Sequence, residues 1–474
     1  MTKILSIDIG TSRIKCALFS ETGKMSSLQS RFLPRTASPD RQDAEAWFQI
    51  LCELLQNISK SLLKQLEAVI ITGNMHALLG IDKDGNCVAP ARLWSDNHAE
   101  TYANRLNQEF GKEFFLREFG NPAIPIFTLP KMLQMKAETP ELYHRSICFL
   151  QSKDYIAYRL TGRLHTDPSD ASGTLMMNAT TQRYHSDFLQ QCGISEDKMP
   201  EIILSTAICG TIHSQASTQT GLLAGTPVIM GCGDLASAAV GSGVDSNTLS
   251  LTLGTSGQLL AAGLHGQGKK IAGKLFLFSH ADPALELYLG SVPAGGFCFD
   301  WLAKKYHITI RDFFDLAAQK ELTADLPLFF PYILGRGAPS MDYHSNGGWR
   351  GLNASHTDAA LCRGAIFGTL CPLRICADLL EKNLGKKTEL SLQALACREK
   401  VVQETASALF TQQKKLPTQT EASLLGSAVI GMTALHIYSS ITEASTAMIQ
   451  TTPINLPHTT IAEKLFQRFQ KEDF

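Results

Sequence analysis

Short apolar segments that end in polar or glycine-containing turns recur along this chain. Residues 4–20 are predicted to form two strands around a polar turn, because apolar positions alternate on both sides of that turn. A buried strand over 68–71 leads into the polar segment 72–76, and an apolar strand over 228–230 leads into a glycine turn that carries Asp234. Polar groups at the carboxyl ends of strands are typical of α/β enzymes.

Helical spacing of apolar residues appears between these strands. Helices are predicted over 44–66, 152–162 and 356–380, and a buried helix rich in small residues over 421–435. Residues 392–410 fit either one amphipathic helix or a strand followed by a helix. The spacing alone leaves both alternatives open for that segment.

An apolar strand followed by Gly-Thr-Ser occurs twice, at residues 10–12 and again at 254–256. Two copies in the two halves of the chain indicate a duplicated architecture, in which each half offers one hydroxyl-lined loop to a shared ligand. A chain of 474 residues is also too long for a single hydrophobic core. We therefore predict an N-terminal domain over residues 1–245 and a C-terminal domain over residues 246–474.

Composition and charge narrow the classes of partner and location. The chain has 43 basic and 44 acidic residues, so its net charge of -1 gives no reason to expect a nucleic-acid or membrane-surface partner. The amino terminus lacks the features of a signal peptide, and no apolar run approaches the length of a membrane span. Twelve scattered cysteines without a C-x-x-C pair favour reduced thiols and a cytoplasmic location.

Two interpretations compete for Asp234. A lone carboxylate between glycines at a strand-to-helix turn suits catalysis, because the glycines let a ligand approach the backbone. Aspartate is also a preferred helix N-cap, and the local pattern by itself favours that interpretation.

The other polar turns are similarly ambiguous. The hydroxyl-rich turn at 10–12, with Lys15 just beyond it, fits either a phosphate cradle or a plain hairpin. His76 is either a structural histidine or a ligand contact. Trp94 and Asp96, after a short apolar strand, are further candidates for ligand contacts.

Taken together, the segments resemble the FGGY family of carbohydrate kinases, and the resemblance runs along nearly the whole chain. Its motifs are IDIGTSRIK (7–15), GNMHALLGID (73–82), LWSD (93–96), GNPAIPIFTLPKML (120–133), KDYIAYRLTG (153–162), SDASGTL (169–175), GCGDLASAAVGSGV (231–244), LGTSG (253–257) and FPYILGRGAPSMD (330–342). So many segments in family order are specific for the fold.

The resemblance implies two actin-like ATPase domains of the ribonuclease-H-like type, with a cleft between them. It implies ATP-dependent phosphorylation of a hydroxyl of a ketose such as D-xylulose, with Asp234 as the base, kept ionised by helix N-terminal N–H groups. The residues implied are Asp8 for Mg²⁺, Thr11, Ser12, Lys15, Gly254, Thr255 and Ser256 for the phosphates of ATP, and Met75, His76 and, as a weaker candidate, Asp96 for the sugar. A homodimer is left open.

The chain also departs from the family pattern. A glycine-rich segment that packs against adenosine in the family is replaced by residues 394–398, which contain no glycine. Further departures are Asn74 for Gln, His98 for Arg, Leu235 for a polar residue and Arg336 for Glu. Two alternatives therefore stay open, namely a weak or inactive sugar-binding protein of kinase fold and a kinase for another ketose or polyol.

Overall fold

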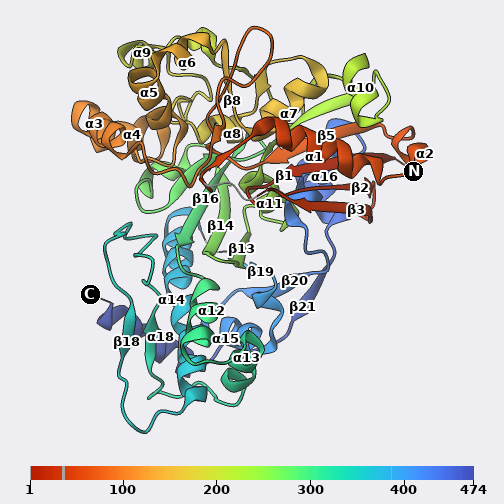
Figure 1. Ribbon diagram of the computed structural model, residues 1–474. Coiled ribbons are helices and arrows are strands. Elements are labelled where there is room, and N and C mark those ends of the chain that lie inside the picture. The colour runs from red at the N-terminus through yellow and green to blue at the C-terminus, as the bar shows by residue number, and fades with distance from the viewer. Residues whose placement is uncertain (1, 35–37, 386, 474) are drawn as a thin grey trace.

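The computed structural model describes residues 2–34, 38–385 and 387–473. Two mixed β-sheets, each covered by helices, form the upper and lower parts of the molecule in Figure 1. This arrangement confirms the predicted two-domain α/β fold.

The first sheet has the strand order β11-β12-β5-β1-β2-β3. Its strands are β1 (Lys3–Ile9), β2 (Arg13–Ser20), β3 (Met25–Phe32), β5 (Ala68–Gly73), β11 (Ile208–Thr211) and β12 (Pro227–Gly233). The hairpin predicted over residues 4–20 is confirmed, because β1 and β2 pair antiparallel. The three central strands β1, β5 and β12 are parallel, so their carboxyl ends meet at one edge of the sheet.

The second sheet has the order β15-β16-β14-β13-β19-β20-β21. Its strands are β13 (Thr248–Leu253), β14 (Gly257–Leu264), β15 (Phe276–Ser279), β16 (Leu285–Val292), β19 (Glu389–Gln393), β20 (Gln413–Pro417) and β21 (Thr451–Ile454). Strand β13 forms a hairpin with β14 and pairs parallel with β19, as β1 does with β2 and β5. The second Gly-Thr-Ser turn therefore takes the same place in its sheet as the first.

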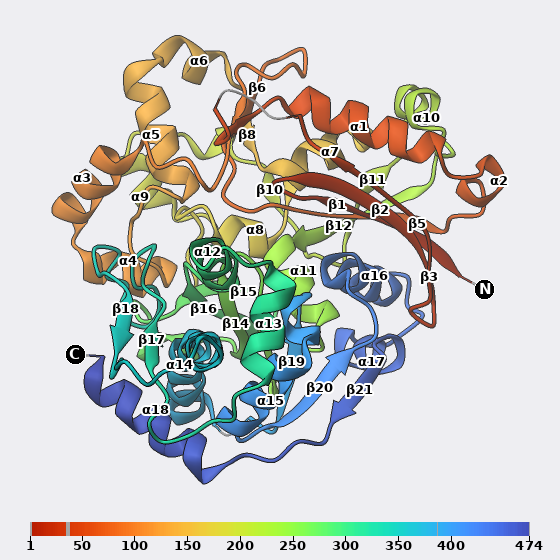
Figure 2. The ribbon, with the colours of Figure 1, turned by 60° about the horizontal axis from the view of Figure 1, so that its bottom comes forward.

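Helices cover both faces of the first sheet. On one face lie α1 (Ala44–Gln56) and α7 (Ser152–Thr161), and on the other lie α11 (Asp234–Gly241) and α16 (Ala422–Ala434). Helix α16 comes from the C-terminal half, yet Figures 1 and 2 show it beside α11 and the first sheet. A Cβ at Gly426 would lie 1.8 Å from the carbonyl oxygen of Ser237, so glycine permits this close helix crossing.

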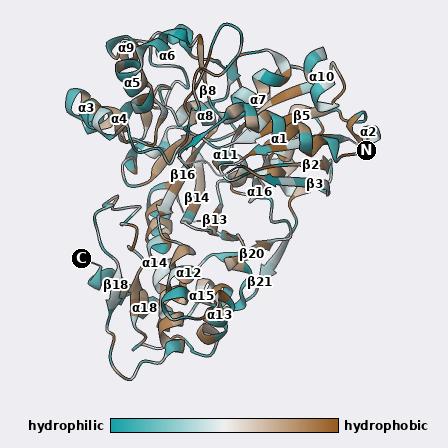
Figure 3. Cartoon of the chain, viewed as in Figure 1, coloured by the Kyte–Doolittle hydropathy of each residue, from teal (hydrophilic) through white to brown (hydrophobic). Residues whose placement is uncertain are grey.

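Helix α14 (Asp358–Leu384) is the central helix against the second sheet. Among the helices of the described residues, it is long and apolar enough to cross a membrane by length and composition, although Arg363 and Arg374 interrupt its apolar residues. Inside the fold, 83% of its most apolar stretch is buried, so it serves as a core helix. Figure 3 shows hydrophobic residues along the central strands and polar residues on outer helices such as α3 and α10.

The segment 392–410 forms the end of β19, a 3-10 turn at Ala396–Arg398 and helix α15 (Lys400–Leu409), which settles the alternatives in favour of a strand followed by a helix. The helix predicted over 44–66 stops at Gln56 and is followed by the short α2 (Lys60–Leu63).

The remaining helices are α3 (Glu100–Phe110), α4 (Lys112–Phe119), α5 (Thr128–Glu138), α6 (Pro140–Arg145), α8 (Pro168–Ser172), α9 (Ser186–Gln191), α10 (Ser214–Thr220), α12 (Phe297–Lys305), α13 (Ile310–Ala318), α17 (Ile441–Met448) and α18 (Thr460–Glu472), with 3-10 turns at Glu196–Lys198 and Gln267–Lys270. The short strands are β4 (Arg41–Gln42), β6 (Leu79–Ile81), β7 (Ala91–Arg92), β8 (Cys148–Leu150), β9 (His165–Thr166), β10 (Glu201–Ile202), β17 (Leu328–Phe330) and β18 (Gly348–Arg350).

Candidate active site

Three of the residues singled out in the sequence gather at the carboxyl edge of the first sheet. Asp8 lies near the end of β1 and is paired in register with Thr72 of β5. Thr72 is in turn paired with Cys232 of β12. His76 follows β5 and Asp234 follows β12, so parallel pairing brings both of them to the edge at which Asp8 lies.

Asp234 is the first residue of α11, and the N-cap is Gly233, whose backbone is extended with ψ 152. The interpretation of Asp234 as the helix N-cap is therefore wrong, because Gly233 takes that position and Asp234 lies one residue inside the helix. The preceding turn depends on glycine. Gly231 has φ +67, and a Cβ there would lie 1.8 Å from the carbonyl oxygen of Ile71.

The carboxylate of Asp234 is partly buried, and burial raises its pKa from 3.8 to about 7. The negative charge of Asp8 raises the pKa further, and the backbone N–H of Leu235 lowers it. The helix N-terminus therefore does not keep Asp234 fully ionised, contrary to expectation, because loss of solvation outweighs the N–H group. A base with a pKa near 7 is well matched to proton transfer at neutral pH.

Asp8 is 7% exposed, and burial raises its pKa to about 6. Lys15 opposes this rise and Glu421 adds to it. The Oδ1 atom of Asp8 is buried and has no hydrogen-bond partner within the described residues. Carboxylate oxygens are the ligands that Mg²⁺ prefers, so an unpartnered oxygen beside a second carboxylate fits such a cation.

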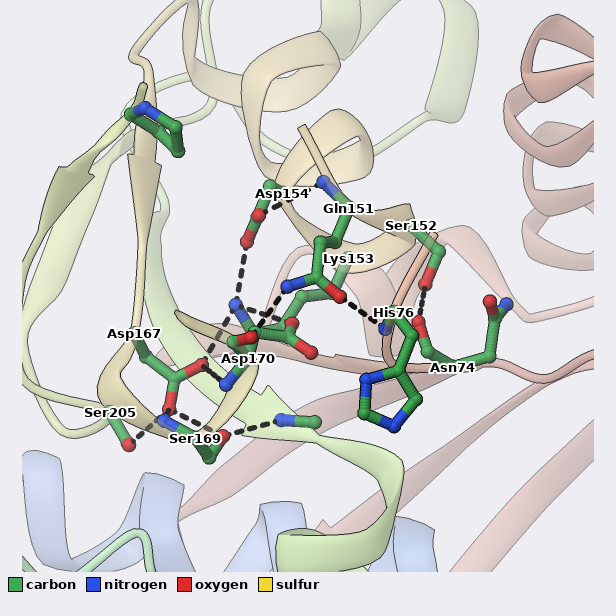
Figure 4. Close-up of polar contacts among 12 residues, drawn as sticks. Asn74, His76, Gln151, Ser152, Lys153, Asp154, Asp167, Ser169, Asp170 and Ser205 are labelled. Carbon is green, nitrogen blue, oxygen red and sulfur yellow. Dashed lines mark hydrogen bonds and ion pairs between the residues drawn. The ribbon is translucent and has the colours of Figure 1, made fainter. Parts of the chain in front are cut away.

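The backbone at His76 is held in an unusual conformation. Its φ of +67 lies in the left-handed region, which is unfavourable for a residue other than glycine. Its N–H donates to Gln151 Oε1 at 2.6 Å, and its carbonyl oxygen accepts a hydrogen bond from Lys131 Nζ at 2.8 Å. Figure 4 shows the imidazole of His76 beside Gln151 and Asn74. These contacts fix the direction in which the ring points.

The imidazole of His76 is neutral, because burial lowers its pKa to about 4. Its Nδ1 lies 2.7 Å from the carbonyl oxygen of Gly173 and must donate to it. This tautomer leaves Nε2 as an acceptor. The ring packs against Phe127 and against Phe278, which belongs to the second sheet.

Met75 is 4% exposed and packs against the turn that precedes Asp234, since a Cβ at Gly233 would lie 2.6 Å from its Cγ. The structure thus gives Met75 a packing role between the two loops, and contact with a sugar stays a prediction for it.

The two carboxylate oxygens of Asp96 already have partners within the protein. Its side chain is fully buried, Oδ2 accepts from Arg92 Nε at 2.6 Å, and Oδ1 accepts from the backbone N–H of His98 at 2.9 Å. Burial opposes ionisation, but these hydrogen bonds outweigh it and hold the pKa of Asp96 well below its usual value. Both oxygens are occupied and buried, and contact of Asp96 with the sugar stays a prediction.

The first Gly-Thr-Ser turn is closed by a hydrogen bond from Gly10 N to Arg13 O, and Thr11 Oγ1 accepts from Trp94 Nε1 at 3.0 Å. Lys15 was predicted to bind phosphate, but its Nζ lies 2.6 Å from Glu421, which directly precedes α16. Glu421 was not among the residues predicted for this site, and no local pattern indicates a partner so far along the chain.

The second turn is open at its tip. Thr255 is exposed, while the backbone N–H of Gly295 donates to Thr255 O and that of Gly296 donates to Gly254 O. A Cβ at Gly295 would lie 2.1 Å from Gly257 N, so the glycine pair permits this contact. The consecutive glycines at 295 and 296 were the sequence signal that could have indicated these hydrogen bonds.

Residues 394 and 395 follow β19 and therefore lie beside the second turn, because Gln393 pairs in register with Thr252. Ala394 has φ +73, so an alanine adopts a backbone conformation that favours glycine. The side chain of Leu395 is 76% exposed. The turn after β19 is thus formed without glycine, and it places the side chains of Ala394 and Leu395 at this edge of the sheet.

Comparisons with known proteins agree with this architecture. The model for the FGGY family of carbohydrate kinases, N-terminal domain, matches residues 3–241, and the model for its C-terminal domain matches residues 249–435. The chain is 29% identical to a xylulose kinase of Bacillus subtilis over 462 residues, which cover 95% of this chain and 92% of that protein.

Two further proteins are similar over nearly the whole chain. A gluconokinase of Bacillus subtilis is 25% identical over 473 residues, which cover 95% of this chain and 92% of that protein. The crystal structure of a ligand-bound xylulose kinase from Lactobacillus acidophilus superposes with a TM-score of 0.89 at 23% identity, covering 100% of this chain and 98% of the other. The chain belongs to the FGGY family of carbohydrate kinases, enzymes that transfer a phosphoryl group to an alcohol.

Proposed function

We propose that this kinase phosphorylates a hydroxyl of a ketose, with D-xylulose as the first candidate, and uses ATP as the phosphoryl donor. The observation that carries the proposal is the carboxylate of Asp234. It has a pKa of about 7 and lies at the same sheet edge as Asp8 and the neutral imidazole of His76. In this proposal Asp234 accepts the hydroxyl proton.

Asp8 would hold Mg²⁺ through Oδ1, which has no hydrogen-bond partner in the described part of the chain. When bound, the cation would supply positive charge that offsets the charge of the phosphates. Hydroxyl and backbone N–H groups of Thr11, Ser12 and residues 254–256 would bind those phosphates. Lys15 would take part only by exchanging its contact with Glu421 for one with a phosphate.

His76 Nε2 would accept a hydrogen bond from a sugar hydroxyl. The gluconokinase among the relatives makes the identity of the substrate an experimental question, because an identity of 29% to a xylulose kinase does not separate ketoses from other polyols.

A coupled assay of ADP formation tests the proposal with D-xylulose, other ketoses, gluconate and glycerol. We expect turnover with a ketose and complete loss in Asp234→Ala, while the exposed Asp312→Ala in helix α13 serves as a control and keeps full activity. Equal rates for wild type and Asp234→Ala on every sugar would refute the proposal.

A second candidate, a kinase fold that binds a sugar without turnover, is favoured only by the side chains of Ala394 and Leu395 where the family has glycine. Titration calorimetry with MgATP separates the two candidates. Absence of heat in both the sugar-free and the sugar-loaded protein would support the second candidate.

A cytoplasmic location, a homodimer and the division of the chain at 245 and 246 remain proposals. Helix α16 qualifies that division, because the C-terminal half contributes it to the first sheet. Limited proteolysis followed by mass analysis would test the boundary, and cleavage clustered elsewhere than residues 241–249 would contradict it.

A further inference from the structure

A buried cation surrounded by three carboxylates adjoins the candidate site (Figure 4). The Nζ of Lys153 lies 2.7 Å from Asp154, 3.0 Å from Asp167 and 3.1 Å from Asp170. All four residues are 1% exposed or less. Well-packed apolar side chains are generally as stabilising as a buried ion cluster, so stability alone does not account for these residues.

The charges of the cluster follow from its contacts. Burial alone would lower the pKa of Lys153, but the three carboxylates outweigh it and hold that pKa well above its ordinary value. Burial, with Asp154 and Asp167 adding to it, raises the pKa of Asp170 well above the usual range. The cluster therefore favours the ammonium form of Lys153 and the protonated form of Asp170.

One arm of the cluster reaches the turn that carries Asp234. Asp167 Oδ2 accepts from the backbone N–H of Ser169 at 3.0 Å and from its hydroxyl at 2.7 Å. The same hydroxyl accepts from the backbone N–H of Gly233 at 2.8 Å. Gly233 directly precedes Asp234 and caps α11, so this arm fixes the backbone from which the carboxylate extends.

A second arm reaches the loop that carries His76. Asp154 Oδ2 accepts from the backbone N–H of Gln151 at 3.1 Å, as part of a capping box at the start of α7. The side chain of Gln151 accepts from His76 N at 2.6 Å and donates to Asp170 O at 2.6 Å. A left-handed backbone at a residue other than glycine costs roughly 1 kcal/mol or more, so His76 needs such contacts to keep its conformation.

The two arms share Lys153. Gly233 also packs between the two loops, because a Cβ at that position would meet Met75 at 2.6 Å and Asp170 Oδ1 at 3.0 Å. The backbone of Gly233 and that of His76 are thus fastened to the same charged cluster from two sides.

We infer that Lys153 and its carboxylates form a positioning network, with Ser169 and Gln151 as its arms, that fixes Asp234 relative to His76. The inference rests on the proposed roles of Asp234 as the base and His76 as a sugar contact. Lys153, Ser169 and Gln151 act through these two residues and are positioning residues.

Two serines provide a matched test of the first arm. Ser169 and Ser205 each donate a hydroxyl hydrogen bond to Asp167 Oδ2, at 2.7 Å and 2.8 Å, and each is 1% exposed or less. Only the hydroxyl of Ser169 also accepts from Gly233 N. Ser169→Ala should lower kcat about tenfold with little change in the KM of the sugar. Ser205→Ala should lower the unfolding free energy measured in urea about as much as Ser169→Ala does, and it should leave kcat unchanged.

The second arm predicts the opposite kinetic signature. Gln151→Ala removes the acceptor of His76 N, so it should raise the KM of the sugar about tenfold and lower kcat much less. Calorimetric titration of D-xylulose into the protein without nucleotide should show the same loss of affinity. The KM of ATP should be unchanged in all three variants.

The central cation is tested with Lys153→Met, which should impair both kcat and the KM of the sugar. Its control is Lys414→Met, which removes a buried lysine that donates to Phe410 O at 2.6 Å in the second domain and should leave both constants unchanged. If Lys153→Met fails to fold, the serine pair and Gln151→Ala decide the matter.

The outcomes separate this inference from the proposed function. Wild-type protein that forms no ADP with any sugar overturns the proposed function, and with it this inference. Active wild type with equal kcat in Ser169→Ala and Ser205→Ala, or with an unchanged KM of the sugar in Gln151→Ala, overturns the positioning network alone.

Discussion

Asp234→Asn should make the folded protein more stable while abolishing its activity. Asparagine has nearly the shape of aspartate and carries no charge, so it removes both the burial of a carboxylate and its repulsion by Asp8. The wild-type protein therefore tolerates a destabilising group at the edge of its first sheet. Stability given up at a reactive site is common in enzymes.

The magnitude follows from the raised pKa. One pKa unit corresponds to about 1.4 kcal/mol, so a shift of Asp234 from 3.8 to about 7 costs at most about 4 kcal/mol of unfolding free energy. Partial exposure of the side chain to solvent reduces this cost, and we expect about 2 kcal/mol. Because the folded state binds the proton of Asp234 more tightly, this carboxyl does not lower the unfolding free energy at a pH below its unfolded-state pKa. Its cost grows as the pH rises from about 4 to about 7 and is constant above that.

Urea unfolding of both proteins between about pH 5 and about pH 8 measures the effect. The stability advantage of Asp234→Asn should increase with pH up to about 7. Asp312→Asn is the control of opposite sign, because hydrogen bonds from Thr309 lower the pKa of that exposed carboxylate and its loss should weaken the protein at neutral pH. An advantage of Asp234→Asn that is absent or independent of pH would refute the reasoning.

Three further predictions concern turnover and binding. The value of kcat/KM for the sugar should rise as the pH increases to about 7, because only ionised Asp234 accepts a proton, and a flat profile would contradict that role. His76→Ala should weaken sugar binding about tenfold in calorimetry and leave MgATP binding unchanged, and equal sugar affinity in both proteins would contradict the contact. Leu395→Gly should tighten MgATP binding severalfold if the exposed side chain crowds the nucleotide, and equal affinity in both proteins would show that it does not.

The strand ends were predictable from sequence because their signals are local. Alternating apolar residues before residue 10, an apolar run before residue 72 and another before residue 231 were enough to place Asp8, His76 and Asp234 at strand ends. Parallel pairing then brings those ends together without further information. The one-residue difference between an N-cap and the first helical residue at Asp234 was not predictable, because Gly233 takes the cap through its extended backbone.

Contacts between distant segments were outside the reach of local pattern. Lys15 and Glu421 are 406 residues apart. Helix α16, near the carboxyl end of the chain, packs against the sheet that the amino-terminal strands form. Asp96 lies in a motif that the family resemblance associates with the sugar, yet Arg92 and His98 occupy its oxygens. Motif position gave the neighbourhood of Asp96 and not the direction of its side chain.

The edges of the two sheets differ in how far they depart from the family pattern. This difference indicates which substrate, sugar or nucleotide, a loss of activity would involve. The first edge keeps a carboxylate with a pKa near 7, a carboxylate oxygen without a hydrogen-bond partner among the described residues, and a neutral imidazole. At the second edge the backbone turn persists, since Ala394 adopts the left-handed conformation at a cost of roughly 1 kcal/mol. What changes there is the space in front of the backbone, which the side chain of Leu395 shares. A defect in catalysis would therefore arise from nucleotide binding at the second edge, with the proton-transfer geometry of the first edge intact.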